Sequence, residues 1–333
     1  MPVLYLIEQG ATLHKQGDLF LITKQGKVLD KVPAIKVEQV VVFGNVNLTT
    51  PVIHYLLEQG IDCVFCSSYG KYHGRLFSTE SKFGLLRRQQ LEMVNNPTKR
   101  LAIAKKMVRG KLLNQRTLLM RYRRQTNLTE LDHLTGEVKH CLQKIDEVEA
   151  LTALQGLEGH ASALYYRAFK NLLRQDFGFV ARVRRPPTDP VNSMLSFGYT
   201  LLVYNVQAAV RIAGLDPFLG FLHATEYSRP SLVLDLMEEF RPIIVDSVVL
   251  RLINTQVITE TDFKHPEEPG KMVLLTDGAI RKFLHQYEER VSSQIFHPNA
   301  GQVTYRRCFE LQARQLVRVI TGREAEYTPF VVK

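Results

Sequence analysis

The stretch QVVVFGNVNLTTPVIHYLLEQGIDCVFCSS, residues 39–68, contains two apolar runs separated by one short helical pattern. Val and Phe dominate the runs QVVVFG and DCVFCSS, which is typical of β-strands. Between them, Thr50 can cap a helix, Pro51 suits its first turn and Gly60 can end it. The stretch therefore predicts a strand, a helix and a second strand in succession.

The residues before this stretch show the same strand pattern. The runs VLYLIE, LFLIT and KVLDKVP are rich in Val, Ile, Leu and Phe, and turn glycines such as Gly10, Gly17 and Gly26 separate them. Several short strands punctuated in this way are typical of a small sandwich or barrel. We therefore expect a β-sandwich-like N-terminal domain over residues 1–85.

Helical spacing replaces the strand pattern after about residue 85. Apolar residues recur every three or four positions in segments such as KRLAIAKKMVRGKLLNQRTLLMRY and LTALQGLEGHASALYYRAFKNLL, almost to the end of the chain. The predicted fold class is α+β and multidomain, with the small N-terminal β-sandwich-like domain followed by a larger all-α domain over residues 86–333. We interpret the apolar run 195–214 as a buried helix, because Asn205 and Arg211 interrupt it.

The composition is that of a globular protein, with 45% hydrophobic and 23% charged residues. Because no run of about 20 apolar residues is uninterrupted and no signal-peptide pattern opens the chain, we expect a cytoplasmic protein without a membrane partner. Cys63 and Cys66 form a C-x-x-C pair in a strand-like run, without a second pair. We interpret them as buried small side chains, with a redox or metal site as the alternative.

Positive charge is concentrated in one predicted helical segment. The net charge of the chain is +10, and residues 87–124 contain twelve Lys or Arg against a single acid, Glu92. A helical segment this basic is typical of surfaces that bind polyanions, so we expect nucleic acid as a ligand. A solvated basic face without a ligand is the alternative.

Ionisable side chains stand among apolar ones at three places in the helical part. Glu158 lies between glycines, His223 follows the apolar run GLDPFLGFL, and Asp235 and Glu238 lie three residues apart on one helical face. Each alone has an ordinary explanation, as a helix-end charge, a core histidine or a solvated acidic face. Together they would supply one imidazole and two or three carboxylates, a ligand set suited to Mg²⁺ or Mn²⁺.

A divalent ion next to a basic surface indicates phosphodiester chemistry. The ion would polarise a phosphodiester for hydrolysis or strand transfer on DNA, while Lys and Arg hold the backbone. No G-x-x-x-x-G-K-[ST] loop, G-x-G-x-x-G fingerprint or G-x-S-x-G elbow occurs, which disfavours NTP hydrolysis, dinucleotide redox chemistry and serine hydrolysis. Tyr165 and Tyr166 could stack on bases or serve as nucleophiles, but we expect them in the core or at an interface.

Three segments, in this order and spacing, closely resemble one known family: LQGLEGHASALYYRAF (154–169), DPVNSMLSFGYTLL (189–202) and FLHATEYSRPSLVLDLMEEFRP (221–242). They resemble the universal adaptation nuclease and integrase of CRISPR systems, the first of the Cas proteins. The resemblance extends over the whole chain, including the late segment LLTDGAIRKFL and the closing QARQLVRVITG. Ordered motifs of this length are a more specific signal than composition or any single residue pair.

The resemblance implies a metal site and its residues. Glu158, His223 and Glu238 match the catalytic positions that hold Mg²⁺ or Mn²⁺ in the family, and Asp235 matches a further acidic position. Proton transfer is an alternative role for His223. Many relatives have Pro where this chain has Glu239, so Glu239 is the alternative to Glu238 as the third ligand.

The resemblance also implies partners and a reaction. It implies a homodimer paired through an N-terminal dimerisation domain (1–85), a C-terminal catalytic domain (86–333) and a small ferredoxin-like second Cas protein as partner. The implied substrate is double-stranded DNA: a 3′-hydroxyl of incoming spacer DNA attacks a phosphate of the CRISPR repeat in a transesterification. The residues expected to hold DNA phosphates are Arg87, Arg88, Lys105, Lys106, Arg109, Arg121, Arg123 and Arg124, with Arg182, Arg184 and Arg185 as weaker candidates.

Two other functions remain open. A general metal-dependent DNA nuclease would use the same carboxylates and histidine, but it would show no preference for repeat DNA or for integration. A non-catalytic structural DNA-binding protein would need only the basic segment, so its acidic residues would be dispensable. Mutation of Glu158 and a comparison of DNA substrates separate these alternatives.

Overall fold

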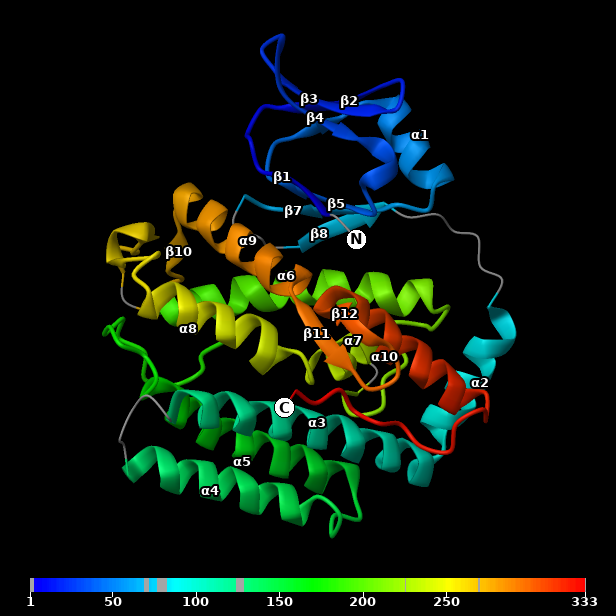
Figure 1. Cartoon of the computed structure of the whole chain (residues 1–333), viewed down its shortest axis with the longest axis vertical. Helices are drawn as coiled ribbons and strands as arrows, with labels where there is room; N and C mark the ends of the chain where they lie inside the picture. Colours follow the sequence, from blue (N-terminus) through cyan, green and yellow to red (C-terminus); the bar gives the residue numbers. More distant parts are fainter. Residues whose placement is uncertain are drawn as a thin grey trace. The chain divides into compact units, whose positions relative to one another are not determined.

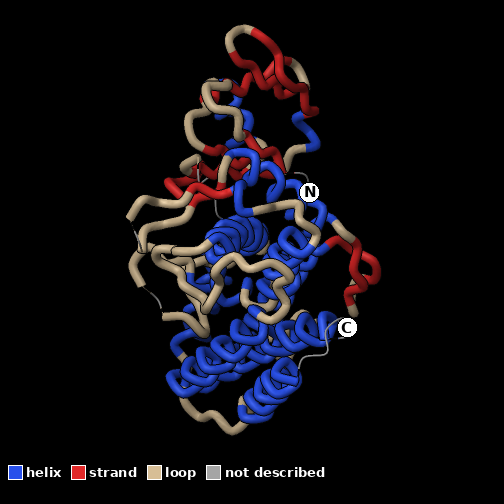
Figure 2. Tube along the Cα trace, turned by 90° about the vertical axis from the view of Figure 1, so that its left-hand side faces the viewer, coloured by secondary structure: helices blue, strands red, loops and turns tan. Residues whose placement is uncertain are grey.

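The computed structural model describes residues 3–68, 72–76, 83–123, 129–224, 226–268 and 270–332. For Tyr72 and Arg123 it describes the backbone alone, and Arg124, one of the predicted DNA-binding residues, lies outside the described residues. The chain divides into two compact units, Met1–Ser81 and Lys82–Lys333 (Figure 1). Most of the strands belong to the first unit, and helices form most of the second (Figure 2).

The described part of the first unit contains two four-stranded sheets. The strands of one sheet, in spatial order, are β1 (Val3–Leu6), β5 (Gln39–Phe43), β7 (Asp62–Cys66) and β8 (Tyr72–Leu76). Those of the other sheet are β4 (Lys27–Pro33), β3 (Leu19–Lys24), β2 (Thr12–Gln16) and β6 (Asn47–Leu48). A single 3-10 turn, η1 (Ala34–Lys36), lies between β4 and β5, and helix α1 (Thr50–Glu58) connects β6 to β7.

The stretch 39–68 forms the predicted strand, helix and strand. Strands β1, β5 and β7 are parallel neighbours. Helix α1 lies between β5 and β7 in the chain and returns it to the end of the sheet at which β5 begins, so β7 runs parallel to β5. Pro51 lies in the first turn of α1, and Gly60 lies just beyond its end with a φ of 65°, a conformation that favours glycine. Strand β8 is antiparallel to β7.

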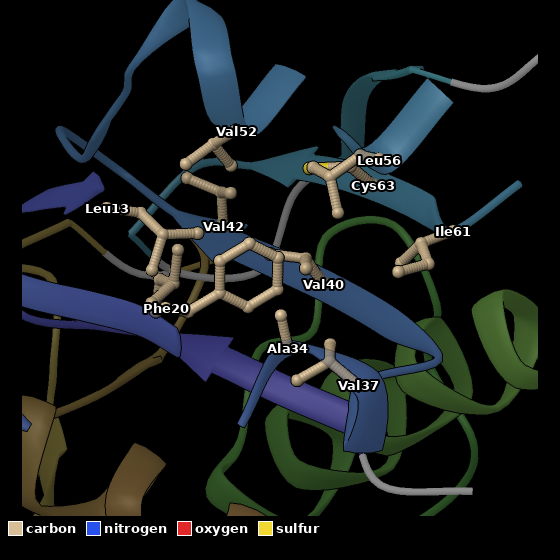
Figure 3. Packing of buried hydrophobic residues seen from close by; sticks show 11 residues of the cluster. Leu13, Phe20, Ala34, Val37, Val40, Val42, Val52, Leu56, Ile61 and Cys63 are labelled. Atoms are coloured by element: carbon tan, nitrogen blue, oxygen red, sulfur yellow. The ribbon is translucent and has the colours of Figure 1, made fainter. Parts of the chain in front are cut away.

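The core of the first unit lies between its two sheets. Leu13 of β2 and Phe20 of β3 point toward Val40 and Val42 of β5, and Val52 of α1 packs on the same cluster (Figure 3). All five side chains are at most 1% exposed. The β-sandwich-like prediction is therefore confirmed, with the difference that one sheet is mostly parallel.

Cys63 and Cys66 are buried in β7 and form no disulfide. Burial, with a smaller effect of Cys66, raises the pKa of the Cys63 thiol to about 12, so this thiol stays protonated. An enclosed, protonated thiol is neither nucleophilic nor a ready metal ligand. The interpretation of both residues as small core side chains agrees with this environment.

The second unit is mostly helical. Its α-helices are α2 (Gly84–Asn95), α3 (Pro97–Arg123), α4 (Thr129–Lys144), α5 (Leu151–Lys170), α6 (Pro190–Ile212), α7 (Ser231–Met237), α8 (Ser247–Asn254), α9 (Asp277–Ser292) and α10 (Tyr305–Ile320). Its shorter elements are a π-helical turn, η2 (Pro242–Asp246), a 3-10 turn, η3 (Glu260–Asp262), and the antiparallel pairs β9 (Phe263–Lys264) with β10 (Leu274–Leu275) and β11 (Gln294–His297) with β12 (Gly301–Thr304). The helical pattern does not predict these strands, but the α+β class with a mostly helical C-terminal part is confirmed.

Helix α6 is buried on nearly all sides. Asp189 caps it by accepting a hydrogen bond from the backbone amide of Asn192 at 2.8 Å, and Pro190 occupies its first turn. Polar Asn205 is buried within it together with its apolar neighbours, which confirms the interpretation of the run 195–214 as a buried helix. Among the described residues, none of the helices combines the length and apolar character needed to cross a membrane.

The close packing of α6 is testable at Gly198. A Cβ atom there would lie 2.6 Å from Val245 Cγ1 and 2.8 Å from Phe283 Cζ. Because these neighbours would have to move, we expect Gly198→Ala to lower the free energy of unfolding by about 1–3 kcal/mol. Urea denaturation followed by circular dichroism measures this change.

Gly136→Ala in α4 is the matched control. Nothing lies within 4 Å of the Cβ position at Gly136. Because alanine is the better helix former, we expect the control to be as stable as the parent or more stable by up to about 1 kcal/mol. Unchanged stability of Gly198→Ala would contradict the close contact of α6 with its neighbours.

Candidate active site

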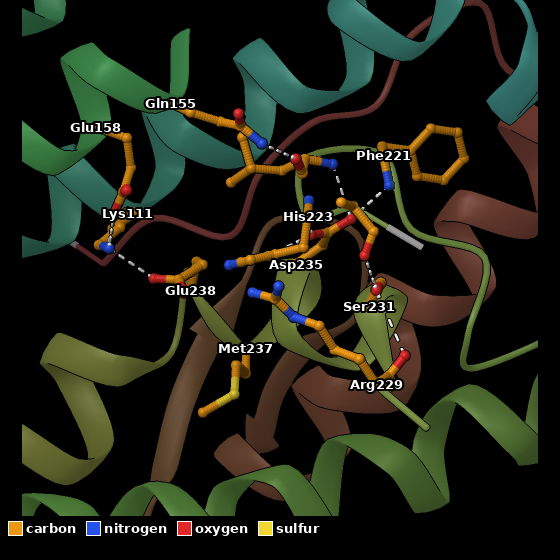
Figure 4. Close-up of polar contacts among 12 residues, drawn as sticks. Lys111, Gln155, Glu158, Phe221, His223, Arg229, Ser231, Asp235, Met237 and Glu238 are labelled. Carbon is orange, nitrogen blue, oxygen red and sulfur yellow. Dashed lines mark hydrogen bonds and ion pairs between the residues drawn. The ribbon is translucent and has the colours of Figure 1, made fainter. Parts of the chain in front are cut away.

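Lys111 connects two carboxylates inside the second unit. Its side chain lies on α3, is 3% exposed and donates a hydrogen bond to Glu158 Oε1 on α5. Its Nζ atom also lies 2.7 Å from Oε2 of Glu238, which follows the last residue of α7 (Figure 4). Glu238 Oε2 has no hydrogen-bond partner among the described residues, so this second contact is an ion pair without hydrogen-bond geometry.

The side chains of this cluster are charged. Burial alone would raise the pKa of Glu238, but Arg241 and Lys111 hold that pKa at about 2. Burial would likewise raise the pKa of Glu158, yet Lys111 keeps it below its usual value. Burial opposes the charge of Lys111, and the two carboxylates raise its pKa nevertheless. Arg241 Nη2, 3.2 Å from Glu238 Oε1, supplies the second positive charge.

Asp235 holds His223 in place. Its buried carboxylate accepts hydrogen bonds from three successive backbone amides, those of Phe221, Leu222 and His223, at 2.5, 3.0 and 2.9 Å. The Nδ1 atom of His223 lies 2.7 Å from the same carboxylate. Because a carboxylate accepts and does not donate, Nδ1 carries a proton, and in a neutral imidazole Nε2 is then the nitrogen with a lone pair that can bind a metal.

Further contacts fix the loop 221–224 that carries this histidine. Arg100 of α3 and Gln155 of α5 donate hydrogen bonds to its backbone carbonyls at 2.9 and 2.7 Å. A Cβ atom at Gly220 would lie 2.8 Å from Asp235 Oδ2, so a larger residue would push the loop away from α7. The histidine is therefore positioned by contacts with three different helices.

Glu239 belongs to a different set of contacts. Its Oε1 atom accepts a hydrogen bond from the Tyr327 hydroxyl at 2.7 Å, and Oε2 accepts from the Phe330 amide at 2.8 Å and from Gln312 Nε2 at 3.2 Å. Burial raises the pKa of Glu239 to about 8, against the effect of these donors. The structure therefore brings Glu238, and not Glu239, to the ammonium group shared with Glu158.

A buried network of tyrosines lies next to Arg241. The guanidinium group of Arg241 is 4.7 Å from the ring centroid of Tyr199. The hydroxyl groups of Tyr199 and Tyr165 both donate to the carboxylate of Asp246 in η2, and the Tyr166 hydroxyl lies 2.6 Å from that of Tyr199. Tyr165 and Tyr166 are 0% and 9% exposed, which confirms the prediction that they are buried.

The predicted DNA-binding residues have different surroundings. Three form ion pairs: Arg88 with Glu92 at 3.6 Å, Lys106 with Glu326 at 2.7 Å and Arg109 with Asp146 at 2.7 Å. Lys105 donates to a backbone carbonyl, Arg184 and Arg185 are exposed in the loop before α6, and Arg121 lines a cavity at the C-terminal end of α3. DNA binding by these residues remains a prediction.

Lys111 is the residue of the site that sequence reasoning misses. The sequence groups it with the basic segment and so with a DNA-binding surface. The position of Lys111 nevertheless contains a signal, because it follows Ala104, Met107 and Val108 at the three- and four-residue spacing of one helix face. All four side chains are buried. A lysine that continues an apolar stripe needs a buried anionic partner.

A metal ion suits these side chains, although they are not arranged as ligands here. The described residues contain no group of three or more His, Cys, Asp or Glu side chains positioned to hold a metal ion. Glu158 and Glu238 nevertheless both contact the ammonium group of Lys111. Among the described residues, Glu238 Oε2 is buried without a hydrogen-bond partner. Carboxylate oxygens with one imidazole match the preferences of Mg²⁺ and Mn²⁺.

Comparison with known proteins shows the family. Residues 4–289 match the family model described as CRISPR associated protein Cas1. The chain therefore belongs to the Cas1 family of CRISPR-associated proteins, and the resemblance inferred from the sequence motifs is confirmed. The CRISPR-associated endonuclease Cas1 3 of Thermus thermophilus is 38% identical to it over 334 residues, which cover 99% of this chain and 97% of that protein. The chain is accordingly an enzyme of a family of endonucleases.

Solved structures show the same fold. A Cas1 protein from Thermotoga maritima has a TM-score of 0.82 with 27% sequence identity, and the match covers 100% of both chains. A chain of a partial Cas6-RT-Cas1–Cas2 complex has a TM-score of 0.69 with 25% identity, covering 100% of this chain and 99% of that chain. The arrangement of a β-rich unit before a helical unit is thus shared with these proteins.

The carboxyl group of Asp246 makes the stability of the fold depend on pH. Burial raises its pKa from 3.8 to about 6, although Tyr165 and Tyr199 act in the opposite direction. The folded state therefore prefers the protonated form, so this contribution to stability is complete below about pH 3.8 and is lost as the pH rises through 6. We expect Asp246→Asn, which stays neutral, to lack this decline in urea denaturations between about pH 4 and 7.

Glu267→Gln is the control for this pH series. Glu267 is exposed in the loop before β10, so its replacement should leave the pH dependence of the parent unchanged. Parallel curves for the parent and Asp246→Asn would show that the folded and unfolded states bind the proton of Asp246 equally.

Proposed function

We propose that this Cas1-family enzyme is a CRISPR adaptation integrase. It would insert short foreign DNA into the CRISPR repeat array, where a 3′-hydroxyl of the incoming DNA attacks a phosphate of the repeat and displaces the adjoining 3′-oxygen. The main support for the proposal is that the carboxylates of Glu158 and Glu238 both contact the buried ammonium group of Lys111. A positive charge on His223 would lower the pKa of Glu238, so the imidazole lies near this carboxylate.

Glu158, His223 and Glu238 would hold one Mg²⁺ or Mn²⁺ ion. Such an ion supplies Lewis-acid stabilisation of the charge that develops on a phosphodiester. The two carboxylates contribute negative charge and His223 contributes its unprotonated Nε2. In the protein without metal, the ammonium group of Lys111 holds the two carboxylates close together. Without this positive charge, the two buried negative charges would repel each other.

Asp235 and Arg241 would act as positioning residues. The hydrogen bond between Asp235 and Nδ1 fixes the ring of His223 and its tautomer. Arg241 lies 3.2 Å from Oε1 of Glu238 and so holds one oxygen while Oε2 faces the shared cation. Neither residue needs to touch the DNA for these roles.

The family and the charge of the chain support a set of proposed partners. We propose that residues 1–85 form a dimerisation domain, that residues 86–333 form the catalytic domain, and that the homodimer acts in the cytoplasm with a small ferredoxin-like second Cas protein. The likeness to a chain of a Cas1–Cas2 complex supports this partner. Apart from Lys111 and Arg100, which contact other parts of the protein, the basic residues between 87 and 124 would hold phosphates of double-stranded DNA together with Arg184 and Arg185.

Strand transfer tests the proposed reaction. A labelled DNA duplex with 3′-hydroxyl ends is incubated with a supercoiled plasmid carrying a CRISPR repeat, the partner protein and Mg²⁺ or Mn²⁺. We expect covalent joining by the parent protein and a loss on the order of 10²-fold or more in Glu158→Ala and His223→Ala, because each change removes a ligand of the metal. DNA affinity, measured by fluorescence anisotropy, should persist.

Two controls separate integration from the alternative functions. Glu149→Ala removes an exposed carboxylate just before α5 and should join DNA like the parent. A duplex with 3′-deoxy ends should not be joined, because it lacks the attacking oxygen. Cleavage of any DNA without joining would favour a general nuclease, and undiminished joining by Glu158→Ala would place the active site elsewhere.

The neighbouring residues Glu238 and Glu239 offer a matched test of the third ligand. We expect Glu238→Gln to weaken Mn²⁺ binding by more than about ten-fold in isothermal titration calorimetry, since it replaces a carboxylate at the shared cation. Glu239→Gln should retain the affinity of the parent, because this side chain contacts Tyr327 and Phe330 instead. The reverse result would make Glu239 the ligand.

A further inference from the structure

The segment 327–332, which we call the strap, lies against α3 next to the candidate site. It follows α10 and forms neither helix nor strand. In Figure 1 it is drawn in red and ends close to α3, near the point marked C. Tyr327, Phe330 and Val332 of the strap are each at most 3% exposed. Because buried backbone groups need hydrogen-bond partners, a segment this buried depends on specific contacts.

Asn114 of α3 binds the strap and the candidate site with one side chain. Its Nδ2 atom donates to the backbone carbonyl of Glu239 at 2.7 Å and to that of Phe330 at 2.8 Å. Its Oδ1 atom accepts from the backbone amide of Val332 at 3.0 Å. Since both kinds of polar group in the amide are used, the loss of Asn114 would free the backbone at all three places.

The side chain of Glu239 also binds the strap. Its two oxygens accept from the Tyr327 hydroxyl at 2.7 Å and from the Phe330 amide at 2.8 Å. Gln312 of α10 donates to Glu239 Oε2 at 3.2 Å and to the Tyr327 hydroxyl at 2.9 Å. Glutamine at position 239 can keep contacts with these groups, because a tyrosine hydroxyl accepts as well as donates. The strap is therefore bound to the residue that follows Glu238.

The strap also packs closely on α3 at Gly110. A Cβ atom at this position would lie 2.5 Å from Pro329 Cβ and 3.1 Å from Glu239 Cγ, so only glycine leaves room for both. The ring of Phe330 stacks on that of Phe240, with the centroids 5.4 Å apart. The chain just after Glu238 is therefore enclosed by α3 and the strap.

The same turn of α3 holds two successive residues after α7. Lys111 and Asn114 lie three positions apart, so they share one face of the helix. Lys111 contacts the carboxylate of Glu238, and Asn114 binds the carbonyl of Glu239. Because successive Cα atoms are only about 3.8 Å apart, a displacement of Glu239 would also move Glu238 away from Glu158.

We propose that Asn114 and the strap are positioning elements of the active site, which hold Glu238 where it can share a metal ion with Glu158 and His223. The inference rests on the proposed role of Glu238 as a metal ligand. Neither Asn114 nor the strap needs to touch the metal or the DNA for this role. Replacing residues that support a ligand in this way typically weakens metal binding on the order of 10- to 100-fold.

Titration of the full-length protein with Mn²⁺ tests this role. We expect Asn114→Ala to weaken Mn²⁺ binding by about ten-fold in isothermal titration calorimetry, because Glu239 and the strap lose their common partner. Tyr327→Phe keeps the buried ring and removes only the hydroxyl that binds Glu239, so it tests the proposal even if Asn114→Ala does not fold. We expect it to weaken Mn²⁺ binding by about three-fold or more. Thermal denaturation checks the fold of each variant.

Asn254→Ala and Tyr287→Phe are the matched controls. Asn254 also joins two backbone segments, since it donates to the carbonyl of Leu172 at 2.8 Å and accepts from the amide of Arg174 at 2.9 Å. Tyr287 is as buried as Tyr327, but its hydroxyl has no hydrogen-bond partner among the described residues. Both controls should bind Mn²⁺ like the parent, even where Asn254→Ala lowers the melting temperature.

Glu238→Gln in the same titration separates this inference from the proposed function. Weaker Mn²⁺ binding by Glu238→Gln, with parent-like binding by Asn114→Ala and Tyr327→Phe, would overturn the inference alone. Parent-like binding by Glu238→Gln would overturn the ligand role of Glu238 and the inference together. Equal weakening in the strap variants and in their controls would show an effect of lowered stability, and so would also contradict a positioning role.

Discussion

The arrangement of the second unit around the candidate site depends most on the ion pairs of Lys111 with Glu158 and Glu238. Without the ammonium group, the carboxylates of Glu158 and Glu238 would be two like charges in a buried place, where desolvation costs several kcal/mol per ion. The three side chains come from α3, from α5 and from the end of α7, so the ion pairs also join these parts of the chain. One buried lysine therefore contributes both to the packing of the helices and to the assembly of the candidate site.

Asp235 similarly stabilises the local fold and the candidate site together. Its carboxylate binds three consecutive backbone amides and the ring of His223, so the loop and the imidazole are fixed by the same group. Behind Glu238, Arg241 and the tyrosines around Asp246 form a second layer of contacts. These contacts hold the side chains of the candidate site in place before any substrate binds.

Positive charge has several roles within a single basic segment. Lys111 is buried between carboxylates, Arg100 supports the histidine loop, and Arg109 pairs with Asp146. Arg121, at the far end of the same helix, lines a cavity with three other arginines. The excess of basic residues over acidic ones predicts an anionic ligand, but the contacts of each side chain decide which of them are available to bind it.

The sequence by itself determined most of the helices and strands, and the glutamates and histidine of the candidate site, because their signals lie within short windows. The strand, helix and strand at 39–68, the helical repeat after residue 85 and the family motifs around Glu158, His223 and Glu238 are local patterns. Only the tertiary structure decided that Lys111 meets a glutamate 47 positions away, since this depends on where separate helices cross. It also distinguished Glu238 from Glu239, because successive helical side chains point about 100° apart and only one of the two can face the shared cation.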